Sequence, residues 1–219
     1  MTPLQVNKLF KSYTDESDRT FLTEEQIGLY LSQAYTEFRQ IVCNIDPYIY
    51  SVEHLFTLGN TNVYDLAANK LLGPSAGAGT KLERLLRVAR VNSQNDVIQW
   101  LDAAPSEKTT PLWGFTFVNS KIIFSSAATN SFRLEYVPFH DVVFEDAGAI
   151  STYIDDLDGF HELIALMAYS RYAIRDGADN AQLLKALGTK RQELDDYLQH
   201  GRNRPGSEYV LDQANNGNW

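Results

Sequence analysis

Apolar residues recur at helical spacing in four stretches of the chain. The clearest stretch places Ile27, Leu31 and Phe38 on one face, which is the three-to-four-residue period of an amphipathic helix. Thr23 and Gln26, at its start, have the spacing of a capping box, in which two side chains satisfy free backbone N–H groups. The same reasoning predicts four helices, over about residues 3–13, 23–43, 159–175 and 179–200.

The last two predicted helices are joined by a short polar turn. Gly177 follows Asp176, and glycine suits the left-handed backbone conformation that often follows a helix end. Asp179 is then the expected N-cap of the second helix, with Gln182 completing another capping box. We therefore predict a C-terminal αα-hairpin, whose second helix carries a stripe of leucines and ends near His200.

Between these helices the pattern changes to an alternation of apolar and polar residues. Phe115 and Phe117 alternate with smaller residues, as in a half-buried strand. The turn residues Asn119 and Ser120 follow, and the chain returns through an apolar run. This pattern predicts a β-hairpin over residues 112–126.

Together the elements predict an α+β fold that is mainly α-helical. We expect a helical bundle with the C-terminal αα-hairpin and a small antiparallel β portion over about residues 85–138. Residues 48–72 mix strand, helix and turn signals and are ambiguous. Residues 1–200 are expected to form a single domain, and residues 201–219, rich in Gly and Asn, an extended C-terminal arm.

Composition narrows the class of protein. The 219 residues are 44% hydrophobic, enough for one good core or two small ones, and the net charge is −9. This charge argues against a surface that binds nucleic acid, which needs clustered Lys and Arg.

Cys43 is the single cysteine, so no disulfide within the chain can form, and we expect Cys43 to be a small buried apolar residue. No apolar run approaches the ~20 residues of a membrane span, so we expect a soluble, intracellular protein.

His161 and Glu162 raise the question of a metal site, because a His-Glu pair on a helix begins the zinc site of some hydrolases. Such a helix needs a second His one turn later, and that position is Ala165. His54, His140 and His200 lie in separate segments. We therefore expect no metal and no catalytic residue, and interpret His161-Glu162 as a surface pair in the first turn of a helix.

Two other stretches fall short of ligand-binding patterns. In the loop of residues 73–80, Gly77 and Gly79 would need a third glycine at Leu82 to complete a dinucleotide-binding loop, and no Lys stands where a phosphate-binding loop requires one. The acidic run of residues 141–158 lacks the spacing of a calcium-binding loop. We expect a mobile loop, a solvated acidic loop and no cofactor.

Two apolar features remain unexplained. The predicted helix over 159–175 is apolar around most of its circumference, which favours burial either in a core or between subunits. The residues on its additional apolar face include Leu166, Tyr169, Tyr172 and Ala173. The tail also holds large apolar residues that it is too short to bury by itself, namely Tyr209, Val210, Leu211 and Trp219.

These pieces, in this order, resemble the head-to-tail adaptor (connector) proteins of tailed bacteriophages, especially those of short-tailed phages. FLTEEQIGLYLSQAYTEF resembles the capped N-terminal helix of that family, and the pair WGFTFVNSKIIF and SFRLEYVPF resembles its strand-turn-strand. DGFHELIALMAYSRYAIRDGADNAQLLKALGTKRQELDDYL resembles its C-terminal helix pair. The resemblance covers roughly half of the chain.

The resemblance implies a structural virion protein without catalytic activity, made in the host cytoplasm and located in the neck of the virion. It implies a homo-oligomeric ring, usually of twelve copies, which binds the portal protein and a tail tube or nozzle protein. Genomic DNA would pass through the channel without specific binding. On this view the apolar helix residues pack between subunits, Tyr209, Val210, Leu211 and Trp219 bind the portal, and Gly77, Gly79, Asn119 and Ser120 lie in loops that face the tail.

Two alternatives stay open. One is a small non-viral protein–protein interaction module with no catalytic activity. The other is an enzyme whose site is assembled from His54, His140 or His161.

Overall fold

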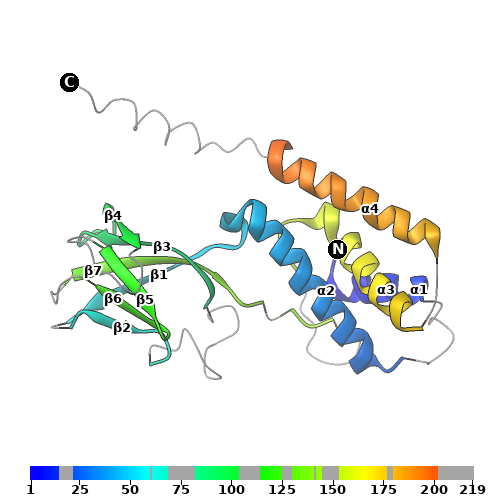
Figure 1. Cartoon of the computed structure of the whole chain (residues 1–219), viewed down its shortest axis with the longest axis horizontal. Coiled ribbons are helices and arrows are strands. Elements are labelled where there is room, and N and C mark those ends of the chain that lie inside the picture. The colour runs from blue at the N-terminus through cyan, green and yellow to red at the C-terminus, as the bar shows by residue number, and fades with distance from the viewer. Residues whose placement is uncertain are drawn as a thin grey trace. The chain divides into compact units, whose positions relative to one another are not determined.

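The computed structural model describes residues 1–14, 22–59, 61–68, 82–103, 114–124, 130–140, 142–144, 153–176 and 180–201. The chain divides into two compact units. The helical unit combines Met1–Asp46 with Val142–Trp219, and the sheet unit is Pro47–Asp141. The chain leaves the helical unit after Asp46 and returns to it at Val142 (Figure 1). That residues 1–200 form a single domain stays a prediction.

The described part of the helical unit contains four α-helices: α1 (Pro3–Tyr13), α2 (Glu24–Ile45), α3 (His161–Asp176) and α4 (Ala181–Asp196). The capping box predicted at the start of α2 is confirmed, because Thr23 accepts from the N–H of Gln26 and the Gln26 side chain accepts from the N–H of Thr23. A second box, Thr2 with Gln5, begins α1. These local signals explain where the first two helices start.

The starts of the last two helices differ from the prediction. The N-cap of α4 is Asn180, not Asp179, and its side chain accepts from the N–H groups of Gln182 and Leu183. Before α3 a short 3-10 helix runs over Asp158–Phe160 and no side chain caps it. The expected capping pattern is satisfied equally well by neighbouring Asn and Asp residues, so spacing alone does not choose between them.

The core of the helical unit forms around α3, which packs against α1, α2 and α4. Seven consecutive residues of α3, from Leu163 to Tyr169, are buried. Phe10 of α1 and Phe38 of α2, in the same unit, are fully buried as well. The apolar circumference recognised in the sequence is therefore covered mainly from within the chain.

The described part of the sheet unit contains seven strands: β1 (Val52–Leu58), β2 (Val63–Asp65), β3 (Leu82–Val91), β4 (Val97–Ala103), β5 (Gly114–Val118), β6 (Lys121–Phe124) and β7 (Asn130–Pro138). They form one sheet in the order β1-β7-β3-β4-β5-β6-β2 (Figure 1). All neighbours are antiparallel except β4 and β5, which pair in parallel over two residue pairs. The sheet curls into a nearly closed, barrel-like form.

The fold class expected from the sequence, a mainly helical bundle with a small antiparallel β portion, is wrong. The sheet is mixed, has seven strands in the described residues and builds its own core. The difference arises in the stretch 48–72, where the sequence mixes signals but the structure places β1 and β2. Both strands are edges that gain their partners, β7 and β6, from distant parts of the chain, so local pattern gives them little support.

An aromatic core fills the sheet unit. The rings of Phe124 and Phe132 stack with centroids 4.2 Å apart, and those of Phe56 and Tyr64 stack at 3.8 Å. The second pair links β1 to β2, the two ends of the strand order, and His54 Nε2 lies 2.8 Å from the Tyr64 hydroxyl beside it. Side chains rather than a backbone ladder therefore close the barrel at this seam.

Candidate interaction surfaces

His161 is fully buried, so its interpretation as part of a surface pair is wrong. Its Nε2 lies 2.7 Å from the Asp155 carboxylate and its Nδ1 lies 3.1 Å from the backbone oxygen of Met1. A carboxylate can only accept, so the first contact places a proton on Nε2. Both ring nitrogens are thus occupied by contacts within the chain.

Asp155, the partner of His161, is held by three donors. Besides the imidazole, it accepts from the Tyr35 hydroxyl at 3.1 Å and from the N–H of Leu157 at 2.9 Å. Burial, reinforced by the Asp155 charge, raises the pKa of Tyr35. The network joins α2, the segment before α3 and the N-terminal residue. A satisfied buried network of this kind fixes the packing of a core.

The acidic run of residues 141–158 is therefore not a wholly solvated loop. Asp155 is buried, as are Phe144, Ile154 and Leu157. The signal that could have revealed this is the pair of apolar residues on either side of the Asp155-Asp156 dipeptide. Glu162 is partly buried and accepts from the Tyr13 hydroxyl at 3.0 Å, and burial together with this contact raises the pKa of Tyr13.

Neither the His161–Asp155 network nor the Tyr13–Glu162 contact forms a metal centre. Within the described ranges, no group of three or more His, Cys, Asp and Glu side chains could hold a metal ion. His54 contacts Tyr64 in the sheet unit, whereas His200 is exposed in a single π-helical turn after α4. Cys43 is a buried thiol near the end of α2, as expected.

The α3 residues expected to pack between subunits are mostly covered by their own chain. Leu166, Tyr169 and Ala173 are buried, and Tyr172 is half-buried with its ring edge-on to Phe10. Side chains that are already covered leave little surface for a neighbour. The exposed apolar residue of α3 is Ile174, with 85% of its surface accessible.

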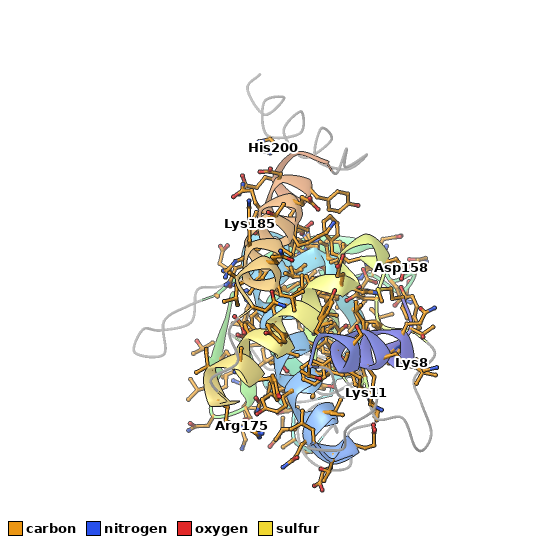
Figure 2. All side chains as sticks on the ribbon, turned by 90° about the vertical axis from the view of Figure 1, so that its right-hand side faces the viewer. Lys8, Lys11, Asp158, Arg175, Lys185 and His200 are labelled. Carbon is orange, nitrogen blue, oxygen red and sulfur yellow. The ribbon has the colours of Figure 1, made fainter. Side chains whose placement is uncertain are left out.

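Unlike α3, helix α4 leaves most of its side chains exposed. Of its 16 residues, Leu194 is buried, while Leu183 and Leu187 are half-buried and Leu184 is 40% exposed. Figure 2 shows α4 with Lys185 along it and His200 near its end. Helices in proteins owe most of their stability to tertiary packing, and α4 receives little of it from the described residues.

The outer face of the sheet carries a second exposed cluster. Arg87 on β3 makes a two-pronged ion pair with Glu135 on β7, at 2.5 and 3.1 Å. Its guanidinium also lies 3.7 Å from the ring centroid of Trp100 and 5.2 Å from that of Tyr48. Trp100 and Tyr48 are 39% and 45% exposed. Aromatic residues and arginine are the types enriched at the centres of protein interfaces, but their spatial grouping could not be read from the sequence.

Asn119 and Ser120 form the predicted turn between β5 and β6, with φ values of 50° and 63°. Two successive left-handed residues are the signature of a type I′ hairpin. Whether the turn faces a tail protein stays a prediction. Gly77, Gly79, Tyr209, Val210, Leu211 and Trp219 lie outside the described residues.

None of the helices in the described ranges is long and apolar enough to cross a membrane.

Known proteins give no independent guide to these surfaces. No protein-family model and no curated protein matches the sequence.

Proposed function

We propose that this chain is a structural virion protein, a head-to-tail adaptor that forms a ring below the portal, extends the DNA channel and docks the tail. The proposal takes the family from the sequence resemblance and the means of assembly from the exposed surfaces. Copies associate through the helical unit, and a portal and a tail protein occupy other surfaces.

The observation that carries the proposal is the incomplete cover of α4. Burying one leucine side chain contributes roughly 1.5–3 kcal/mol, and α4 leaves Leu184 exposed and Leu183 and Leu187 only half-covered. In contrast, α2 buries nine of its 22 residues. A helix of this kind gains cover when another subunit packs on it. The separate cluster around Arg87 and Trp100 on the sheet unit supplies a surface for a different partner.

The charge of the chain agrees with a channel protein. A net charge of −9 gives a surface that repels phosphates, so DNA can pass without being held. A nucleic-acid-binding protein would instead carry an excess of Lys and Arg.

Mixing the purified chain with the portal protein encoded by the same phage tests this function. We expect a closed ring of chains on the portal, seen by electron microscopy and confirmed by mass measurement. A stable small oligomer that ignores the portal would refute the adaptor function and favour the interaction module without a virion role. A variant lacking residues 207–219 tests the portal-binding arm separately, since unchanged affinity for portal would refute that assignment alone.

A further inference from the structure

Gly188 lies in the middle of α4, and the described part of the chain gives no packing reason for a glycine there. Glycine is among the least favourable residues in a helix interior. It is often kept where a neighbouring side chain leaves no room for a Cβ, yet a Cβ built on Gly188 meets no atom of the described residues within 4 Å. The contacts among the described residues of one chain therefore do not explain this glycine. A close approach by a partner would explain it, because a helix without a side chain at that point lets another backbone come near.

The residues one turn on either side of Gly188 share its face of the helix. Leu184 precedes it by four positions and Arg191 follows it by three, and both are exposed, so they lie in one line along the surface. Asp195, half-buried, continues this line toward the C-terminal end. The face thus presents an apolar residue, then a gap, then a cation.

The outward face of α2 is complementary to this line. Leu29 is 59% exposed, the largest exposure among apolar side chains of α2 in the described residues. Glu25 lies one turn before it and Gln33 one turn after it, both exposed. If the two helices run antiparallel, Leu29 meets Leu184 and Gly188, while Glu25 faces Arg191. Asp195 then lies toward the N-terminal end of α2, where a helix favours negative charge.

These two faces are different surfaces of the same unit. Both α2 and α4 pack on α3, and their exposed stripes point away from it. Contact between two different surfaces is head-to-tail, and repetition of such a contact generates a ring when the rotation closes. A two-fold dimer would instead pair α4 with α4, or would make the α2–α4 contact twice between the same two copies and so stop at two chains.

We propose that the face of α4 formed by Leu184, Gly188 and Arg191 is the docking surface for a second copy of this chain, which presents Leu29 and Glu25 of α2. The proposal rests on the ring of the proposed function and gives that ring its subunit contact. The gap at Gly188 admits the α2 side chains, and Arg191 pairs with Glu25.

The first experiment replaces Gly188 by leucine in the full chain. Leucine is a better helix former than glycine, and the site is open, so the unfolding temperature of the free chain should stay or rise. The association constant of the chains, measured by sedimentation, should fall at least tenfold. Thr189→Leu is the matched control, because Thr189 is also exposed but lies outside the line, and it should associate normally. If Gly188→Leu and Thr189→Leu both have the association constant of the unchanged chain, the proposal is overturned.

The second experiment joins the two faces covalently. The double variant Leu29→Cys, Leu184→Cys should give a ladder of disulfide-linked chains on oxidation, while each single variant should not. The native Cys43 is buried, so it should not contribute. Dimers from Leu184→Cys alone would indicate two-fold packing of α4 and overturn the head-to-tail contact.

Oxidising both the concentrated chain and its mixture with portal separates the two proposals. Rings on the portal without the ladder refute the contact and leave the adaptor function standing. A ladder in the chain alone, with no binding to portal, supports the contact and refutes the adaptor function. The absence of both refutes both.

Discussion

Replacing His161 by alanine should destabilise the helical unit more than any surface change can. The imidazole is fully buried and is one of three donors to the Asp155 carboxylate, at 2.7 Å. A hydrogen bond to a charged group contributes about 1.5–3 kcal/mol, and alanine also leaves a cavity where the imidazole was. Tyr35 and Leu157 still donate to Asp155, so we expect a loss of about 3 kcal/mol, the upper end of that range.

Urea denaturation followed by circular dichroism at 222 nm measures this loss, because helices dominate that signal. His200→Ala is the matched control, since His200 is exposed and surface changes usually stay within about 0.5 kcal/mol. The variants Asp155→Asn and His161→Ala, alone and combined, give the coupling of the pair. A loss below about 1 kcal/mol for His161→Ala would refute the view that this network fixes the unit.

Three further predictions concern the sheet unit and can be followed by fluorescence and urea midpoints. Burial lowers the pKa of His54 from its ordinary value of 6.5. The unfolded chain therefore binds more protons, and stability should be full above about pH 6.5 and fall below it; His54→Gln should remove this dependence, and an unchanged pH profile would contradict it. Ser120→Gly should raise stability by about 0.5–1 kcal/mol, because glycine adopts the left-handed turn conformation without strain; a lower midpoint would argue against that origin. Arg87→Ala should cost about 1.5–3 kcal/mol by leaving Glu135 buried without its cation. Arg87→Lys should restore only part of this, since lysine cannot reproduce the two-pronged pair and the stacking on Trp100; full recovery would count against both contacts.

Sequence pattern predicts most of the helical unit because its signals are local. The capping box of Thr23 and Gln26 marks the start of α2, and the apolar period of the following residues marks the face that packs on α3. The turn at Asn119 and Ser120 is local in the same sense, since two adjacent residues set the hairpin between β5 and β6.

What the pattern misses depends on partners that are far away in the chain. Strand β1 pairs with β7, so Val52 lies opposite Tyr136, and nothing near residue 52 specifies that pairing. His161 is buried against Asp155 and Met1, and the contact with Met1 joins residues 160 positions apart. The same limit applies to the cluster on β3, β4 and β7 around Arg87, because only the strand order brings its members together.

The manner in which the barrel is closed has a mechanical consequence. Strands β1, β7, β3 and β4 form one arc and β5, β6 and β2 another. Two parallel residue pairs join the arcs at β4 and β5. Elsewhere rings rather than backbone bonds join them, namely Phe56 with Tyr64 at β1 and β2 and Phe132 with Phe124 at β7 and β6. Each arc can keep its own ladder while the distance between the arcs changes. The short β4–β5 pairing can therefore act as a hinge between the two arcs. A force that pulls the arcs apart should separate the stacked rings before it breaks the backbone hydrogen bonds within either arc.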